Sequence, residues 1–168
     1  MTIRKKEITI EPIREEHIEG YHKCLDQVAR ERRFLGSTQA PPLDSSRQFV
    51  LANITQGVPQ YVALEGNTVV GWIDILPKRS EPFRHCGVLG MGVSKKYRGI
   101  GIGKRLMDAA LAHVEKISLE RVELEVYSSN LPAISLYERY GFNREGVKVK
   151  ACKLDGVYDD VVEMALFV

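Results

Sequence analysis

Three glycines at alternate positions lie between an apolar run and a helix-like run near the middle of this 168-residue chain. They belong to the segment Arg98-Gly99-Ile100-Gly101-Ile102-Gly103-Lys104-Arg105. Glycine has no Cβ, so this spacing allows a sharp turn with exposed backbone N–H groups. The helix start that follows adds unpaired N–H donors and the positive end of a helix dipole. The segment therefore predicts a binding site for a phosphate-bearing ligand between a strand and a helix.

Two widespread phosphate-binding loops do not fit this segment. The P-loop of nucleotide hydrolases needs a glycine five positions before its Gly-Lys pair and a hydroxyl after it. Arg98 and Arg105 occupy those two positions here. The dinucleotide fingerprint Gly-x-Gly-x-x-Gly needs a third glycine where Lys104 or Leu106 stands. The residues therefore support neither of these two ligand classes.

Hydrophobic periodicity predicts one mixed α/β domain over residues 1–168. Alternation favours strands at 8–13, 60–65, 68–76, 85–93, 121–127, 142–150 and 156–168. Helical spacing favours helices at 15–32, from a cap at Asp44 or Ser45 to Gly57, at 106–117 and at 130–140. The Gly66-Asn67 pair predicts a hairpin. We expect a mostly antiparallel central sheet flanked by helices, with a βαβ unit at residues 85–127.

Composition excludes several classes of function. A formal net charge of +2 argues against nucleic acid and anionic membranes as partners. The three cysteines, Cys24, Cys86 and Cys152, form no CxxC pair and so predict neither a metal site nor a disulfide framework. Residues 1–6 lack the apolar core of a secretory signal, and no apolar run approaches a membrane span. We therefore expect a cytoplasmic protein without a metal.

Two segments resemble the GNAT superfamily of acetyl-CoA-dependent N-acetyltransferases. The pattern Arg-x-x-Gly-x-Gly at residues 98–103, preceded by Val93 and Tyr97, is similar to the family's pyrophosphate loop. The segment from Asn130 to Phe142, with its Asn, Ala, Tyr and Gly-Phe, is similar to the family's second motif. The roughly 30 residues between them equal one βαβ crossover. The resemblance covers about residues 60–168. Its last part, with Gly146 and residues 153–158, looks similar to small bacterial GNAT enzymes that act on amino acids or related amines.

The resemblance implies a GNAT-like fold, acetyl-CoA as the acetyl donor and a set of residues that hold it. Backbone N–H groups of the glycine segment would bind the pyrophosphate, the strand before it would pair with the pantetheine arm, and Asn130 would contact that arm. Tyr137 would protonate the departing thiolate, and a backbone N–H near Met91 would polarise the thioester carbonyl. The implied donor-binding residues are Met91, Gly92, Val93, Arg98, Gly99, Ile100, Gly101, Ile102, Gly103, Lys104, Asn130 and Tyr137.

The reaction also needs a base, because the attacking amine must be neutral. The sequence leaves Asp74, His85, Glu123, Glu125 and a water molecule open as candidates. Alternation favours the solvent face for Asp74, while a position in the core would raise its pKa. Gly90 and Gly92 predict a bulge that separates their strand from the next one and makes room for the thioester. Tyr140, three residues later, is the other tyrosine that could be mistaken for the thiolate partner assigned to Tyr137.

Three functions remain open at this point. The first is acetylation of a primary amine, such as an amino acid, by direct attack in a ternary complex. The second is acetylation of a protein N-terminus or lysine, and the third is acyl-CoA binding without catalysis. Substrate choice would reside in residues 29–44 and 148–160, and the family habit implies a homodimer.

Overall fold

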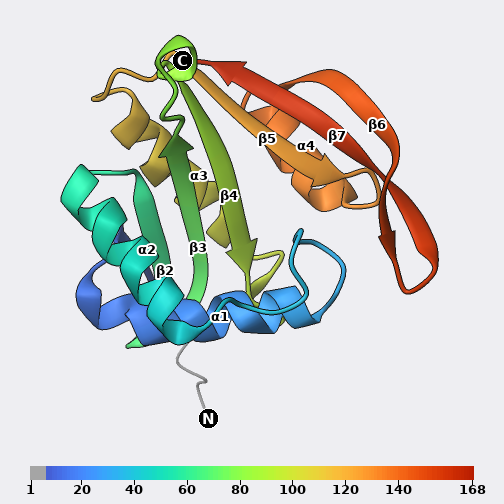
Figure 1. Cartoon of the computed structure of the whole chain (residues 1–168). Coiled ribbons are helices and arrows are strands. Elements are labelled where there is room, and N and C mark those ends of the chain that lie inside the picture. The colour runs from blue at the N-terminus through green and yellow to red at the C-terminus, as the bar shows by residue number, and fades with distance from the viewer. Residues whose placement is uncertain (1–6) are drawn as a thin grey trace.

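The computed structural model describes residues 7–168. Residues 1–6, on which the prediction of no secretory signal rests, lie outside the described residues. A seven-stranded sheet with the order β1-β2-β3-β4-β5-β7-β6 organises the chain (Figure 1). The strands are β1 (Ile8–Pro12), β2 (Gln60–Glu65), β3 (Thr68–Pro77), β4 (Cys86–Val93), β5 (Arg121–Tyr127), β6 (Asn143–Leu154) and β7 (Val157–Phe167). Only β4 and β5 pair in parallel, so the predicted mixed and mostly antiparallel sheet is confirmed.

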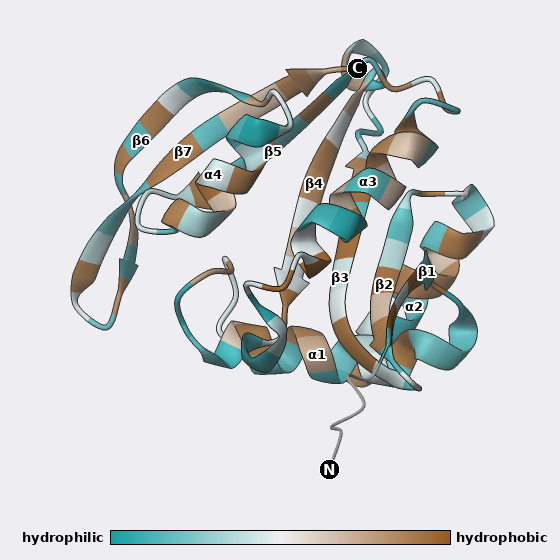
Figure 2. Cartoon of the chain, turned by 180° about the vertical axis from the view of Figure 1, so that it is seen from behind, coloured by the Kyte–Doolittle hydropathy of each residue, from teal (hydrophilic) through white to brown (hydrophobic). Residues whose placement is uncertain are grey.

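Two helices cover each face of the sheet, as Figures 1 and 2 show from opposite sides. On the face that we call the front lie α1 (Ile18–Arg30) and α2 (Leu43–Gln56). On the back lie α3 (Ile102–Val114) and α4 (Leu131–Arg139). Three short 3₁₀ turns complete the described elements: η1 (Glu15–His17), η2 (Glu81–Phe83) and η3 (Lys95–Tyr97). None of the helices in this part of the chain has the length and apolar character that crossing a membrane requires.

Each face of the sheet has its own hydrophobic core. The front core packs α1 and α2 on β2 and β3, and its members include Ile18, Tyr21, Val28, Val50, Val62 and Trp72. The back core packs α3 and α4 on all the strands except β6, with Ile73, Leu106, Met107, Val122, Tyr137 and Met164 among its members. Burial of apolar surface on both faces is what holds the strands at fixed positions relative to the helices.

The helix of the βαβ unit begins earlier than its hydrophobic stripe predicts. The apolar positions from Leu106 onward suggest a start at that residue, whereas α3 begins at Ile102, directly after Gly101. The first turn therefore contains Gly103 and Lys104, which contribute little to the stripe. As a result, the glycine segment is half loop and half helix N-terminus.

The start of α2 also differs from the prediction. Pro42 occupies the N-cap, and its carbonyl accepts the N–H groups of Ser45 and Ser46 at 2.9 and 3.2 Å. The expected side-chain cap from Asp44 or Ser45 is wrong, because the fixed φ of proline already suits the entry into a helix. The predicted end at Gly57 is confirmed, with φ of +64°.

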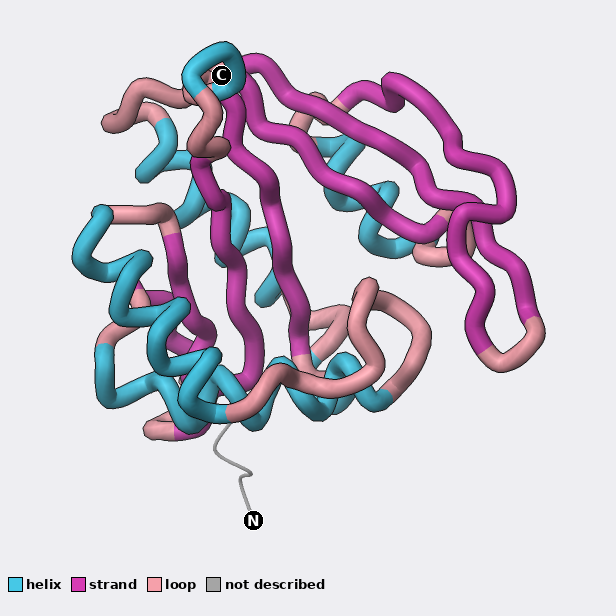
Figure 3. The backbone as a smooth tube through the Cα atoms, viewed as in Figure 1, coloured by secondary structure: helices cyan, strands magenta, loops and turns pink. Residues whose placement is uncertain are grey.

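The strands β4 and β5 pair at one end only. Parallel pairing joins Cys86–Val88 to Arg121–Glu123, while β4 remains paired with β3 as far as Val93. Beyond Val88 the two strands diverge, which Figure 3 shows along the backbone. We call the diverging part, Leu89–Val93 and Leu124–Tyr127, the β4–β5 wedge. Along it, the β5-side edge of β4 has no strand partner among the described residues.

Candidate active site

The glycine segment forms an uncapped helix N-terminus. Gly99 and Gly101 have φ of +76° and +87°, a conformation that L side chains rarely adopt. Gly101 is the N-cap of α3, no side chain caps the helix, and the bond from the N–H of Arg105 to the carbonyl of Gly101 measures 3.2 Å. The N–H groups of Ile102, Gly103 and Lys104 precede that first bond, so they are free donors at the positive end of the helix.

The space in front of these donors is open. A Cβ added at Gly99 or Gly101 would meet no atom within 4 Å, and Ile100 is 59% exposed. An anionic group can therefore approach the backbone closely from solvent. The segment thus has room for an anionic group at the helix N-terminus; that this group is a coenzyme pyrophosphate stays a prediction from the sequence.

The charged side chains of this segment bind protein groups instead. Arg98 donates two hydrogen bonds to the Glu31 carboxylate, at 2.9 and 2.6 Å, and one to the carbonyl of Val93 at 2.8 Å. Its guanidinium also lies 4.7 Å from the ring centroid of Phe34. Arg98 thus joins the end of α1 to the glycine segment, and its guanidinium is already occupied by protein groups.

The side chains of Lys104 and Arg105 also bind protein groups. The Lys104 ammonium pairs with Asp108 at 3.0 Å, and Arg105 donates to the carbonyl of Ile8 at 2.9 Å. Anion binding at this site therefore depends on backbone N–H groups and the helix dipole more than on formal charge.

Gly90 and Gly92 have a different role from the predicted one. The ladder between β3 and β4 runs without a register shift from Gly71↔Val93 to Pro77↔Gly87, so the expected bulge is wrong. The predicted separation from the next strand is present, since pairing with β5 ends at Val88. Instead, a Cβ on Gly92 would lie 2.3 Å from the Trp72 ring, and one on Gly90 would lie 3.3 Å from Oδ1 of Asp74. The glycines admit these two β3 side chains to the front surface of β4.

Tyr137 lies on the side of α4 that faces the sheet. Asn130 caps α4 by accepting the N–H of Ala133 at 3.4 Å, which confirms the predicted helix start. The Tyr137 ring is 7% exposed and packs on Phe142 at 5.8 Å between centroids. Burial raises the pKa of its phenol to about 12. Within residues 7–168 its hydroxyl makes no hydrogen bond, so the proton is free for a ligand.

Tyr140 is distinguished from Tyr137 by its partners. Its hydroxyl donates to the carbonyl of Lys104 at 2.8 Å and also contacts Asp108. Near this contact, Leu136 of α4 would meet a Cβ on Gly103 at 3.2 Å, and Met91 of β4 would meet it at 3.4 Å. Tyr140 therefore fastens α4 to the first turn of α3, beside the start of the β4–β5 wedge.

The four side chains considered as bases lie in different environments. Glu123 pairs with Lys78 and Arg121, and hydrogen bonds from these cations lower its pKa. Glu125 is exposed and bonded to Lys148. His85 precedes β4 at the end where β4 and β5 are still paired, away from the wedge.

Asp74 differs from the other three candidates. It is only 6% exposed, and burial raises its pKa to about 7. The prediction of a solvent-facing Asp74 is wrong, because α1 and α2 cover the front of β3.

A second opening lies where the loop after α1 approaches the β6–β7 hairpin. A pocket of about 170 Å³ is lined there by Arg32, Arg33, Tyr127, Ser129, Cys152, Leu154, Val157 and Asp159. Arg32 bridges its rim with two hydrogen bonds to Asp155, at 3.0 and 2.8 Å. The Tyr127 hydroxyl donates to the carbonyl of Leu35 at 3.1 Å. Both segments expected to select the substrate, 29–44 and 148–160, thus meet at this pocket.

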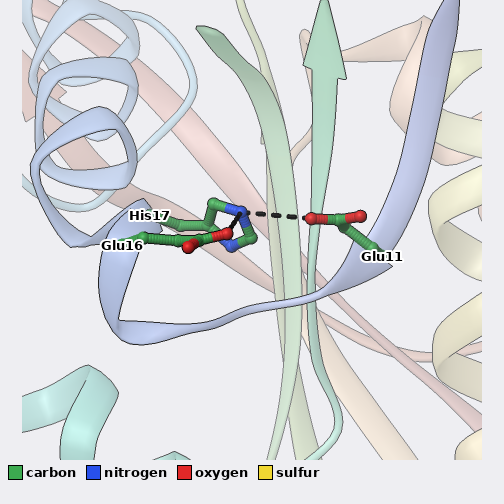
Figure 4. Close-up of side chains that lie close together, drawn as sticks. All are labelled: Glu11, Glu16 and His17. Carbon is green, nitrogen blue, oxygen red and sulfur yellow. Dashed lines mark ion pairs between the residues drawn. The ribbon is translucent and has the colours of Figure 1, made fainter. Parts of the chain in front are cut away.

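One cluster in the described part of the chain has the composition of a metal site, namely Glu11, Glu16 and His17 (Figure 4). Nδ1 of His17 accepts the N–H of Arg14 at 3.0 Å, and Nε2 faces Glu11 at 3.2 Å. Both ring nitrogens are therefore used in fixing the turn before α1. The cluster lies at β1 and η1, outside the β4–β5 wedge.

Sequence reasoning missed the functions of Trp72 and Glu31. From the sequence, a tryptophan in a strand is expected to be a core residue. Only the pairing of Trp72 with Gly92 reveals that the Trp72 ring lies over the glycines of β4. Glu31 lies 67 residues from its partner Arg98, so no local pattern connects them.

Comparison with known proteins agrees with this geometry. The family model described as "Acetyltransferase (GNAT) family" matches residues 23–142. The L-amino acid N-acetyltransferase AaaT of Escherichia coli (strain K12) is 29% identical over 155 residues, which cover 91% of this chain and 95% of that protein.

Two solved structures share the fold. One is an acetyltransferase of the GNAT family from Streptococcus pneumoniae, with a TM-score of 0.89 and 22% identity over 96% of this chain and 100% of that one. The other, an acetyltransferase from Salmonella typhimurium with its cofactor acetyl-CoA, has a TM-score of 0.89 and 18% identity, covering 95% of this chain and 93% of that one.

Proposed function

Since the chain belongs to the acetyltransferase (GNAT) family, we propose that it moves an acetyl group from acetyl-CoA to the primary amine of a small molecule, such as an amino acid. The observation that carries this proposal is the uncapped N-terminus of α3, which follows the C-terminal end of β4 beside the β4–β5 wedge, with α4 and its unbonded Tyr137 hydroxyl nearby.

Donor binding uses the backbone in two places. The free N–H groups of the glycine segment hold the pyrophosphate. The unpaired edge of β4 at Met91, Gly92 and Val93 pairs with the amide groups of the pantetheine arm, as an added strand would. Asn130 adds a side-chain contact from the start of α4.

Acetyl transfer then needs one bond made and one broken. The neutral amine attacks the thioester carbonyl, whose oxygen is polarised by a backbone N–H near Met91. As the C–N bond forms and the C–S bond breaks, Tyr137 gives its proton to the thiolate. The amine loses two protons overall, one to a base and one that restores the Tyr137 phenol.

The acceptor end favours a small molecule. The pair Arg32–Asp155 joins the loop after α1 to the tip of the β6–β7 hairpin, across the course that an extended peptide would need. Arg33 lines the pocket and has no carboxylate partner within residues 7–168, so it can bind a carboxylate of the acceptor. The amino-acid specificity of the Escherichia coli relative supports this class.

The test is release of free thiol from acetyl-CoA with a panel of amino acids, polyamines and peptides, with each product identified by mass spectrometry. Turnover of small amines and not of peptides supports the proposal. Turnover of peptides alone would assign a protein acetyltransferase, and acetyl-CoA binding without any turnover would assign a non-catalytic acyl-CoA-binding protein.

We also propose that the enzyme is a homodimer. β6 is an edge strand of the sheet, and its Val147 and Val149 are 52% and 72% exposed. An exposed apolar edge strand can pair with the same strand of a second copy of the chain. Light scattering in solution measures this, and a monomer at all concentrations would contradict it.

The same proposal places the enzyme in the cytoplasm. Its support is the state of Cys24, Cys86 and Cys152, which are all free thiols. Free thiols persist in a reducing compartment. Cell fractionation with an antibody to the chain tests this location.

A further inference from the structure

Three buried polar groups meet under α1 and α2 with unused hydrogen-bonding capacity. The Asp74 carboxylate on β3 lies directly across from Gln60 on β2. Burial, and after it the charge of Asp74, raises the pKa of the Tyr21 phenol on α1. Gln60 accepts from Asn53 at 2.9 Å, but its Nε2 has no partner. In the part of the chain that the structure describes, neither the Asp74 carboxylate nor the Tyr21 hydroxyl makes a hydrogen bond.

Such a cluster is costly for a fold. Asp74, Gln60 and Tyr21 are 6%, 2% and 4% exposed, and buried polar groups are nearly always paired. A polar group buried without a partner destabilises a protein by about 1–3 kcal/mol. A carboxylate is a worse case than a neutral group, because its charge loses hydration. Of the polar atoms in this cluster, only Nε2 of Gln60 is fully buried without a partner. The unbonded Asp74 carboxylate can therefore accept a hydrogen bond from a ligand that reaches it.

The position of Asp74 relates it to the acetyl group. Its Oδ1 would lie 3.3 Å from a Cβ at Gly90, so the carboxylate covers the front of β4 at that residue. Met91, next along the strand, is where the proposed function places the thioester carbonyl. The loop after α1, on the acceptor side, lies on the front beside the C-terminal end of β4 (Figure 1). Asp74 therefore lies on the side from which the acceptor arrives.

We propose that Asp74 is the general base, and that its carboxylate takes a proton from the ammonium group of the acceptor in front of Gly90. This inference rests on the proposed function and deepens it. The ammonium gives one proton to the carboxylate, the neutral amine forms the C–N bond, and the C–S bond breaks. The thiolate takes the proton of Tyr137, the second amine proton restores that phenol, and Asp74 releases its proton to solvent.

The electrostatics of the site suit this role. Among the described residues, the Tyr21 phenol of α1 feels the charge of Asp74, and Gln60 of β2 and Gly90 of β4 lie opposite it in the sheet. Burial raises the pKa of Asp74 to about 7, and a base is most effective when its pKa lies near the working pH. The competing carboxylate Glu123 is held ionised by Lys78 and Arg121 and so is a weaker base.

The experiment compares Asp74→Asn with Glu123→Gln as a matched strand carboxylate. The kcat/KM of the wild type for its amine should rise with pH through an apparent pKa of about 7. Asp74→Asn should lower kcat/KM by about 100-fold or more at neutral pH. It should also remove the rise of kcat/KM through a pKa of about 7, which we call the acidic limb. Its rate should then follow the titration of the free amine. Glu123→Gln should keep the acidic limb of kcat/KM.

A melting curve separates catalysis from folding. The folded state raises the pKa of this carboxyl, so the ionised form destabilises the wild type progressively as pH rises from about 4 to about 7. Asp74→Asn should therefore melt at a higher temperature than the wild type at pH 8, with the difference closing near pH 4. If Asp74→Asn does not fold, Gly90→Ala, which places a Cβ at 3.3 Å from the carboxylate, should lower kcat and keep acetyl-CoA binding.

A folded Asp74→Asn or Gly90→Ala variant with the wild-type rate and acidic limb would overturn the assignment of Asp74. Lack of turnover by the wild type with every amine would overturn the proposed function itself, and this inference with it. The two failures are distinct because only the second affects the wild-type enzyme.

Discussion

The hydrogen-bond partners of a side chain decide whether it can give up a proton in this site. Tyr137 and Tyr140 are three residues apart on one helix, yet one hydroxyl is unbonded and the other is held by Lys104 and Asp108. Sequence spacing leaves both tyrosines as candidates, and only their partners separate Tyr137, the proposed proton donor, from Tyr140, whose hydroxyl is bonded.

Replacing Tyr137 with phenylalanine keeps the packing ring and removes the acidic proton. We expect Tyr137→Phe to lower kcat by about 10- to 100-fold and to change the affinity for acetyl-CoA less than twofold, because the lost interaction forms only as the thiolate leaves. Single-turnover kinetics and calorimetry measure the two quantities. Tyr140→Phe is the comparison. It should lower the melting temperature and leave kcat nearly unchanged. An unchanged kcat in Tyr137→Phe would assign the proton to another group.

At the scale of elements, the donor and acceptor halves of the site are mechanically joined. Arg98 follows β4, while Glu31 is the C-cap of α1 and starts the acceptor loop. Their bidentate bond therefore links the glycine segment to the loop that the proposed function assigns to the acceptor. Two partly buried side chains in this geometry form a stronger pair than an exposed one.

A double-mutant cycle measures that link. Glu31→Gln, Arg98→Ala and the double variant should give a coupling free energy of about 1–2 kcal/mol in unfolding. Each single variant should also raise the KM for the amine, because the acceptor loop loses its anchor. The ion pair Arg30–Asp26 on the exposed side of α1 is the control and should couple by less than about 0.5 kcal/mol. Equal coupling in the two pairs would contradict a special role for Arg98.

The elements themselves were largely predictable, while their partners were not. Alternation and glycine turns locate all the strands, and the β4–β5 parallel pair follows from the βαβ unit. The strand pattern could not place Asp74, because exposure depends on α1 and α2 crossing that face. Gly90 and Gly92 suggested a bulge since the ring of Trp72 that they admit belongs to another strand. Contacts between distant segments, such as Glu31 with Arg98, carry no local signal.

In the proposed function, the donor side and the acceptor side of the whole molecule meet across β4. The donor side is the back, where α3 and α4 flank the wedge. The acceptor side is the front, where the loop after α1 approaches the β6–β7 hairpin. Arg32 and Asp155 hold these two segments together at the surface, with positive φ of 54° and 51° respectively.

Opening this contact should change selectivity more than stability. Arg32→Ala removes an exposed ion pair, so the melting temperature should change by less than about 2 °C. The KM for a small amine should rise several-fold and turnover of short peptides should increase, because the rim of the pocket is no longer bridged. Kinetics with both acceptor classes measure this. Unaltered selectivity would show that this rim does not restrict the acceptor.

Binding of acetyl-CoA to the glycine segment tests the central claim most directly. Titration calorimetry should give a one-to-one complex for the wild type and none for Gly101→Val, whose β-branched side chain strains φ of +87° and crowds the free N–H groups. The control is Gly57→Val at the end of α2, where φ is +64° and the site is remote. It should have comparable strain and normal binding. Tight binding by a folded Gly101→Val variant would contradict the account.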